Sequence, residues 1–305
     1  MLVRANGNAP TVSPHRARLI PAFRPVGRSN LVGCMGPLFS TYDVGGEVVN
    51  VDRVGAGTPR VRVPLLDIDV TPMNARIAAE WAAGQSRKAL LLNHNLHSAY
   101  LYQRDPQFRA LYALADQILV DGAPILWLGR LRDRATFQRD QRIGSTDWID
   151  HLSRTPLRSP KTLAILGARP ESNHEAVVAL RQRIGACGWT VVGLDGYQDD
   201  TDALKWLTDV RPDLVLVGLG MPQQEHFLLR NFQALPTAVY ATVGGAIDYI
   251  AGVNILAPRW MGRLGLEWLW RLWHEPRRLG HRYLIEPILL TREIIAREYR
   301  RLRSR

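Results

Sequence analysis

The chain has 305 residues, of which 46% are hydrophobic and 22% are charged, the composition of a soluble globular protein with ample core. Its two cysteines exclude a disulfide framework and favour a reducing cytoplasm, and no apolar run approaches the roughly 18 residues of a transmembrane helix. The formal net charge of +11 predicts an anionic partner: nucleic acid, an acidic lipid surface or a phosphorylated substrate.

Residues 1–60 differ from the rest of the chain. They scatter Gly, Pro, Asn and Arg, hold no acidic residue before Asp43, and lack the continuous apolar segment of a secretory signal. We expect residues 1–30 to be flexible and residues 31–60 to form short strands, together an N-terminal extension.

Short apolar runs alternate with amphipathic stretches from residue 61 onward. We predict a helix over 71–84, started by Thr71-Pro72, and a helix over 96–115 that breaks near Pro106. The strands expected between the helices lie at 63–70, 88–93, 116–120, 161–167, 189–196, 213–220 and 238–245. This alternation predicts an α/β fold: a Rossmann-like, mainly parallel sheet flanked by helices over 61–253.

Three strand ends share one design, "LVDGAP", "AILGARP" and "VGLGMP", with a glycine turn and then a proline where a helix begins. Such junctions line the carboxyl edge of a parallel sheet, where open α/β folds bind ligands. We therefore expect substrate contacts at Gly122, Gly218 and Gly220 of these turns. We expect the same of Gly244 and Gly245, which end the strand predicted at 238–245.

Asp121 ends the third predicted strand and is the best catalytic candidate. A carboxylate facing a ligand crevice can take a proton from a substrate hydroxyl, which is typically worth about 10²–10⁴-fold in rate. The alternative is an N-cap aspartate for the helix that starts near Pro124. Local sequence weighs the two roles evenly.

The segment "NHNLHS" places Asn93, His94, Asn95 and His97 at another strand end. The two histidines could share a face, but no third ligand is evident, so hydrogen bonding to a sugar or phosphate is favoured over a metal site. Structural capping stays open. The D-x-D of "LLDIDV" lies inside a predicted strand and is interpreted as structural.

The segment "GLGMPQQEHF" offers backbone N–H groups at a helix start, a ready anion site. Gln223 occupies the third glycine position of the dinucleotide fingerprint, and no Gly-Lys-Ser/Thr follows as in a Walker loop. A nucleotide-dependent oxidoreductase is therefore disfavoured.

Residues 254–305 hold 12 arginines and five acidic residues, so the basic charge is concentrated in a C-terminal appendage. On one helix, Arg263, Glu267 and Arg271 would form a polar stripe at i, i+4 and i+8, with nearly everything else apolar. This stripe could close over a diphosphate or be a solvated salt-bridge row. The last run is a basic amphipathic helix, typical of an anionic membrane surface.

Together these segments resemble the WecG/TagA/CpsF family of bacterial glycosyltransferases. The landmarks are "ADQILVDGAPILW", "RIGSTD", "LAILGARP", "PDLVLVGLGMPQQEHF", "VGGAIDYIAG" and "APRWMGRLGLEWLWRLWHEPRR", from about Leu65 to Tyr283. The resemblance implies inverting transfer of a sugar from a UDP-sugar to a polyprenyl-diphosphate-linked saccharide, without metal or cofactor. It also implies a cytoplasmic enzyme attached peripherally to the inner face of the cell membrane through the C-terminal segment, which completes the active site.

The resemblance assigns roles residue by residue. Asp121 matches the proposed general base, Asn95 an asparagine next to the reaction centre, and Arg142 an arginine of the substrate site. Gln224 matches a glutamine placed for donor recognition, and Asn93 falls where some members carry threonine.

The "NHNLHS" variant resembles the branch that builds xanthan-type exopolysaccharide, so UDP-glucose is the expected donor. The alternative is transfer of N-acetylmannosamine or its uronic acid. A different class, a basic nucleic-acid-binding protein, is disfavoured because the arginines cluster beside tryptophans and apolar stripes. The sequence leaves a homo-oligomeric state open.

Overall fold

A computed structural model describes residues 42–44, 47–49 and 59–303, all within a unit that spans Cys34–Arg305. The flexibility predicted for residues 1–30 lies outside the described residues. Two short strands, β1 (Tyr42–Val44) and β2 (Glu47–Val49), pair antiparallel in the segment where short strands are expected.

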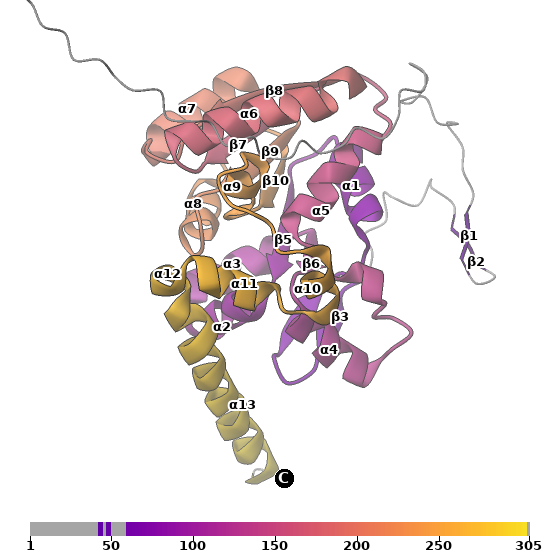
Figure 1. Ribbon diagram of the computed structural model, residues 1–305, viewed down its shortest axis with the longest axis vertical. Helices are drawn as coiled ribbons and strands as arrows, with labels where there is room; N and C mark the ends of the chain where they lie inside the picture. The colour runs from indigo at the N-terminus through magenta and orange to yellow at the C-terminus, as the bar shows by residue number, and fades with distance from the viewer. Residues whose placement is uncertain (1–41, 45–46, 50–58, 304–305) are drawn as a thin grey trace, which may run out of the picture. The chain divides into compact units, whose positions relative to one another are not determined.

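A six-stranded parallel sheet forms the centre of the fold, as predicted (Figure 1). Its strands lie in the order β6-β5-β10-β9-β7-β8. Their bounds are β5 (Ala89–His94), β6 (Gln117–Val120), β7 (Lys161–Gly167), β8 (Trp189–Leu194), β9 (Leu214–Gly218) and β10 (Val239–Thr242). β5 and β10, which are far apart in sequence, pair at the middle of the sheet.

Helices cover both faces of the sheet, so the central strands are apolar on both sides. One face carries α1 (Ala75–Gly84), α5 (Ser145–His151), α6 (Pro170–Ile184) and α9 (Ala246–Ile250). The other carries α2 (Leu96–Arg104), α3 (Pro106–Leu114), α4 (Ala123–Arg132), α7 (Asp200–Val210) and α8 (Gln223–Asn231). Consecutive residues such as Leu90 and Leu91 point to opposite faces of the sheet and belong to two different hydrophobic cores.

The strand predicted at 63–70 is wrong. The segment folds back as an antiparallel hairpin, β3 (Val61–Val63) and β4 (Ile68–Val70), with Leu65 and Asp67 at positive φ. Arg62 forms ion pairs with Asp67 and Asp69, both at 3.1 Å, so the D-x-D aspartates hold the hairpin together. This agrees with their structural interpretation.

Of the two helices predicted first along the chain, the predicted start of one is wrong and the predicted break in the other is confirmed. α1 begins at Ala75, not at Thr71-Pro72, because Asn74 caps it by accepting a hydrogen bond from the Ile77 N–H at 3.0 Å. The break near Pro106 is confirmed, since Asp105 ends α2 and caps α3.

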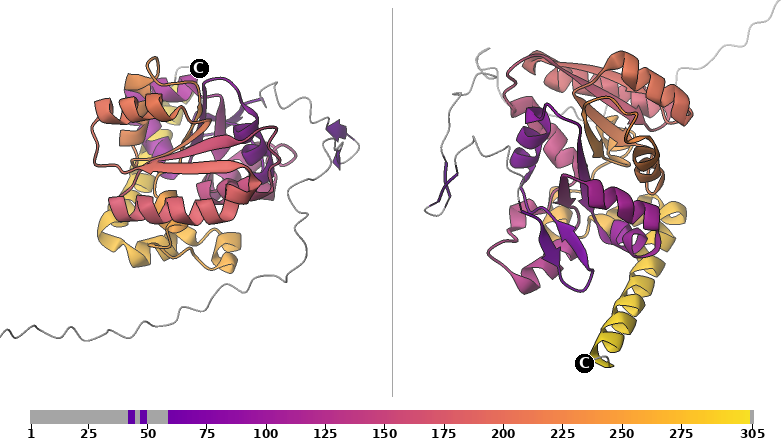
Figure 2. Two further views of the ribbon diagram at one scale, coloured as in Figure 1. Left: turned by 90° about the horizontal axis from the view of Figure 1, so that it is seen from above. Right: turned by 180° about the vertical axis from the view of Figure 1, so that it is seen from behind.

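The C-terminal appendage is a chain of short helices and one long one. Its elements are α10 (Arg259–Leu264), α11 (Glu267–His274), α12 (Pro276–Gly280), a π-helical segment (His281–Ile285) and α13 (Glu286–Arg303). Figure 2 shows α13 leaving the α/β layers beside α2, which it contacts. None of the described helices has both the length and the apolar character needed to cross a bilayer.

The single helix expected for Arg263, Glu267 and Arg271 is wrong. Gly265, at φ +73, ends α10, and a Cβ on Gly265 would lie 2.8 Å from the Ala123 Cβ. Glu267 and Arg271 share α11, whereas Arg263 belongs to α10 and its side chain lies outside what the structure describes. The glycine lets the chain turn against α4.

Candidate active site

The ends of β5 and β6 bring Asn95 and Asp121 together. β5 ends at His94, and Asn95 caps α2 by accepting a hydrogen bond from the Ser98 N–H at 3.0 Å. The Asp121 N–H donates to the His94 carbonyl at 2.9 Å, which continues the pairing of the two strands. Asn95 Nδ2 then donates to Asp121 Oδ2 at 3.2 Å. The cap residue of α2 therefore also orients the carboxylate.

Asp121 is not the cap of the helix that follows it. The N-cap position of α4 is Gly122, at φ +96, where a non-glycine residue would be strained. The structure thus contradicts the capping alternative. Asp121 is half-buried at the carboxyl edge of the sheet, where parallel α/β folds place reacting groups.

Burial raises the pKa of Asp121 above its usual value. The positive charge of Arg271 opposes this rise, as does the hydrogen bond from Asn95. Glu267 adds to the rise and Arg282 opposes it. The carboxylate is therefore poised between a desolvating environment and two guanidinium groups from the appendage.

Arg142 connects the C-terminal appendage to the carboxyl edge of the sheet, where Asp121 lies; this edge is called the catalytic edge below. Its backbone lies beside β6, since Ile143 N–H donates to the Val120 carbonyl at 3.0 Å. Its guanidinium contacts Glu267 Oε2 at 3.0 Å and the Gly262 carbonyl at 2.9 Å. A Cβ on Gly262 would stand 2.6 Å from Glu267 Oε1, so glycine permits this close approach. The described contacts of the Arg142 side chain are with the appendage.

Two arginines of the appendage act electrostatically on the Asp121 carboxylate. The Arg271 guanidinium lies 5.2 Å from the centre of the Tyr249 ring, and the Arg282 guanidinium lies 5.8 Å from that of Tyr283. Burial lowers the pKa of Arg282, and its Nε has no hydrogen-bond partner among the described residues. Sequence analysis missed Arg282, because nothing distinguishes it from the other tail arginines and the π-helical segment that places it has no sequence signature.

The ends of β9 and β10 form the second half of the site. Gln224 is buried, and its side chain accepts from the Gly244 N–H at 3.1 Å and donates to Glu225 Oε1 at 2.8 Å. Asn93 is also buried and donates to the Thr242 carbonyl at 2.9 Å. Both side-chain amides thus brace neighbouring strand ends within the protein.

Glu225 belongs to the same helix start, and the sequence analysis assigned it no role. Burial raises its pKa to about 8, and one of its carboxylate oxygens has no partner among the described residues. Arg282 acts electrostatically on both Glu225 and Asp121, so it links the two halves of the site. In the sequence, Glu225 is a charged residue in the first turn of a predicted helix, and this pattern fits an exposed position equally well.

The turn glycines divide into two kinds. A Cβ on Gly218 would lie 2.2 Å from Ile247 Cδ1, so Gly218 serves packing. Gly220 and Gly244 have φ of +81 and +50, and no described atom lies within 4 Å of an added Cβ at either, or at Gly245. The backbone at these three positions is open to an approaching ligand.

The two histidines of "NHNLHS" are separated by the fold. His94 is buried, stacks on Tyr112 at 4.3 Å, and has its pKa lowered by burial to about 3. His97 instead contacts Glu286 of α13 at 2.5 Å. Within residues 59–303 and the two short strands, no three His, Cys, Asp or Glu side chains are grouped to hold a metal ion.

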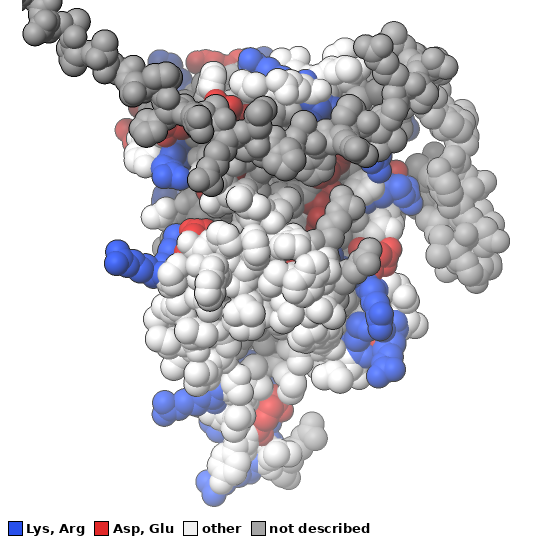
Figure 3. Space-filling view, viewed as in Figure 1, with Lys and Arg blue, Asp and Glu red and all other residues white. Residues whose placement is uncertain are grey.

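The appendage carries an apolar surface. Trp260, Leu264, Trp268 and Trp273 on α10 and α11 are all exposed, Trp273 by 82%. Figure 3 shows uncharged side chains dominating the surface over these helices, with arginines and lysines mostly toward its margins. The rest of the protein therefore covers this apolar segment only in part.

Comparison with known proteins gives one family match and curated relatives. The family described as "Glycosyl transferase WecG/TagA/CpsF family" matches residues 61–304. A relative from Bacillus subtilis (strain 168) is 29% identical over 207 residues, which cover 67% of this chain and 78% of the relative. A relative from Bacillus spizizenii (strain ATCC 23059 / NRRL B-14472 / W23) is 27% identical over 196 residues, 64% of this chain and 74% of the relative. Both are named N-acetylglucosaminyldiphosphoundecaprenol N-acetyl-beta-D-mannosaminyltransferase.

Proposed function

The chain belongs to the WecG/TagA/CpsF family of glycosyltransferases, and we propose that it transfers an N-acetylmannosaminyl group from a UDP-sugar to a polyprenyl-diphosphate-linked N-acetylglucosamine. The observation that carries this proposal is the half-buried Asp121 carboxylate, oriented by Asn95 and flanked by the charges of Arg271 and Arg282. That arrangement suits a base beside an anionic leaving group.

In the proposed reaction, Asp121 accepts the proton of an acceptor hydroxyl as its oxygen attacks the anomeric carbon. The bond from that carbon to the diphosphate oxygen breaks, and UDP leaves with inversion. A raised pKa makes the carboxylate a better base near neutral pH. Arg271 and Arg282 meet the charge that develops on the diphosphate, a preorganised electrostatic contribution.

The sugar is the finer part of the proposal. Both relatives are named for N-acetylmannosaminyl transfer to a diphosphoundecaprenol-linked N-acetylglucosamine. Their names favour the alternative reading of the sequence over UDP-glucose, which gains no support from them. We therefore expect UDP-N-acetylmannosamine to exceed UDP-glucose as donor.

We also infer that the enzyme works at a membrane surface, because its proposed acceptor is lipid-linked and Trp260, Trp268 and Trp273 of α10 and α11 are exposed. Aromatic side chains with basic neighbours favour an anionic interface. Flotation of the full chain with phosphatidylglycerol vesicles, compared with neutral vesicles, tests this part.

The test of the reaction is a panel of radiolabelled UDP-sugars with lipid-linked acceptors, run on the wild type and two variants. Asp121→Asn should keep its melting temperature and lose roughly 10²-fold or more in kcat. The matched control is Asp116→Asn, because Asp116 precedes the same strand at the opposite edge, where it accepts from the Leu90 N–H. Near-normal turnover by Asp121→Asn would refute the base assignment.

A further inference from the structure

An apolar groove lies along α13, outside the catalytic edge. It has a volume of about 600 Å³, within the range of about 300–1,000 Å³ of small-molecule sites. One wall is α13, which contributes Leu290, Ile294 and Leu302. The opposite wall combines the β3–β4 hairpin with the first turn of α2 and with α4, through Leu65, Leu96 and Leu128.

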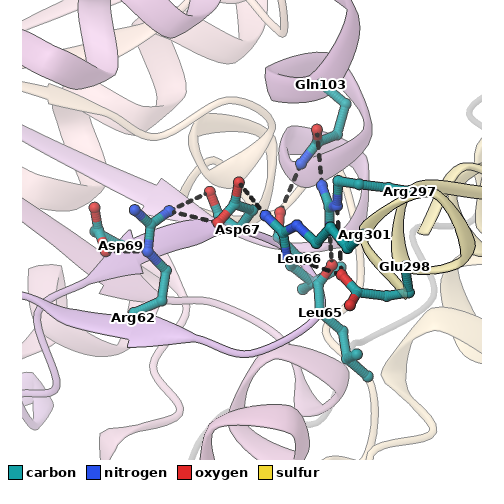
Figure 4. Close-up of polar contacts among 9 residues, drawn as sticks. All are labelled: Arg62, Leu65, Leu66, Asp67, Asp69, Gln103, Arg297, Glu298 and Arg301. Atoms are coloured by element: carbon teal, nitrogen blue, oxygen red, sulfur yellow. Dashed lines mark hydrogen bonds and ion pairs between the residues drawn. The ribbon is translucent and has the colours of Figure 1, made fainter. Parts of the chain in front are cut away.

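Polar contacts hold the far part of α13 against the hairpin (Figure 4). Arg297 donates to the Leu65 carbonyl and to Gln103 Oε1, and Gln103 Nε2 donates to the Leu66 carbonyl at 2.6 Å. Arg301 lies 3.9 Å from Asp67 of the hairpin turn. The Leu65 carbonyl thus binds α13 directly, and Gln103 of α2 links the Leu66 carbonyl to Arg297, so the groove is a built feature with walls from four elements.

Two residues of the groove directly follow residues that contact the candidate active site or its neighbours. Leu96 directly follows Asn95, which binds Asp121. Pro287, which also lines the groove, directly follows Glu286, the partner of His97. The buried Nε of Arg282 has no hydrogen-bond partner among the described residues, and Arg282 precedes Pro287 by five residues, about 7.5 Å at a helical rise of 1.5 Å per residue. The start of α2 and the segment leading into α13 therefore each carry polar or cationic residues beside residues of the apolar groove.

We propose that this groove binds the first isoprene units of the polyprenyl chain of the acceptor, while its diphosphate lies near Arg282 and Arg271. The inference rests on the proposed function, because it assigns a place to the lipid of that acceptor. From Pro287 to Leu302 the groove runs about 22 Å at 1.5 Å per residue, enough for several isoprene units. The remainder of the chain continues into the bilayer.

The chemistry of the groove and of the arginines near it favours a polyprenyl diphosphate as the ligand. An amphiphile with an anionic head and a long apolar tail matches the arginines near one end and a largely apolar channel, in which the one charged lining residue, Glu298, is paired with Arg301. Ile295 and Leu302 are 64% and 71% exposed, so a tail in the groove would cover apolar surface that water now contacts.

The experiment is isothermal titration calorimetry of the full chain without vesicles, with farnesyl diphosphate and inorganic diphosphate as the two probes. We expect farnesyl diphosphate to bind at least roughly tenfold more tightly, with a negative heat-capacity change. Thr291→Trp fills the groove and should reduce the affinity for farnesyl diphosphate to nearly that for diphosphate. The matched control, Ile288→Trp, alters an exposed position of the same helix that does not line the groove, and should bind as the wild type does.

A second groove variant, Leu302→Glu, guards against a folding defect in Thr291→Trp, and circular dichroism checks all three proteins. Equal binding of the two probes by the wild type would overturn the proposal. So would equal losses in Thr291→Trp and Ile288→Trp, which would mark a general membrane-contact face. A groove variant that lowers the sedimentation mass would assign the groove to a second copy of the chain and likewise refute the proposal.

The binding readout is independent of sugar transfer. If farnesyl diphosphate binds as expected but no UDP-sugar is used, the groove stands and the proposed reaction fails. If transfer occurs with no preference for a lipid tail, the reaction stands and the groove assignment fails.

Discussion

Glu267 forms an ion pair with Arg142 and acts electrostatically on Asp121. We therefore expect substitution of Arg142 and substitution of Glu267 to shift the pH dependence of the enzyme in opposite directions. It contacts Arg142 at 3.0 Å, and its negative charge raises the pKa of Asp121. Arg142→Met leaves that charge without its partner, whereas Glu267→Gln removes the charge. Both substitutions weaken the contact between the appendage and the catalytic edge.

The stability cost follows from the contacts that each substitution removes. The ion pair is partly exposed, with side-chain exposures of 23% and 39%, so it contributes about 0.2–1 kcal/mol. Arg142→Met also removes the hydrogen bond to the Gly262 carbonyl, and a hydrogen bond from a charged group adds about 1.5 kcal/mol. We expect Arg142→Met to lower the free energy of unfolding by about 2 kcal/mol and Glu267→Gln by less than about 1 kcal/mol.

The pH profile of kcat/KM separates electrostatics from simple loosening of the appendage. In the proposed reaction the deprotonated form of Asp121 is the active one, so we expect activity above its pKa and a loss of activity as pH falls through it. Arg142→Met should move this acid limb to higher pH, and Glu267→Gln should move it to lower pH. The assay is initial-rate kinetics with a lipid-linked acceptor, in a constant-ionic-strength buffer series.

Shifts of the acid limb in the same direction would refute the electrostatic reasoning. An unchanged limb in both variants, with equal losses of kcat, would show that Arg142 and Glu267 only fasten the appendage. Chemical denaturation of each variant then reports whether the loss follows the unfolding free energy.

Two further predictions concern stability. Glu225 holds a proton in the folded protein up to about pH 8 and releases it near 4.5 when unfolded, so it favours folding at low pH and this contribution is lost as pH rises toward 8. Glu225→Gln cannot ionise, and its melting temperature should therefore fall less between pH 5 and pH 8.5 than that of the wild type; an equal fall would contradict the buried, protonated state. Gly218→Ala should cost about 1–3 kcal/mol, because its Cβ would stand 2.2 Å from Ile247 Cδ1. The double variant with Ile247→Val removes that atom, and denaturant titration should show partial recovery.

The sheet could be predicted from the sequence because each of its strands is one short, continuous apolar segment. Each parallel strand is buried on both faces, so it appears as a short apolar run whatever its neighbours are. The hairpin at 61–70 escaped prediction because its turn depends on Arg62 and two aspartates that close it across the strands. The helix break at Gly265 was hidden because apolar periodicity continues on both sides of the glycine.

The candidate site was predictable where it depends on strand ends and not where it depends on tertiary contact. Asp121 and Asn95 could be placed at one sheet edge from topology alone. The charges that act on Asp121 come from Arg271 and Arg282, more than 140 residues later in the chain, and no local pattern reports such pairing. Gln224 matched a donor-binding position, yet its amide is occupied by Gly244 and Glu225.

The late position of the appendage has a consequence for biosynthesis. The α/β layers end at α9, but the guanidinium groups that act on Asp121 belong to the last 50 residues of the chain. At a synthesis rate of about 5–20 residues per second, these residues emerge seconds after the sheet can fold. A nascent chain on the ribosome therefore carries the Asp121 carboxylate before Arg271 and Arg282, which act on it, have been synthesised.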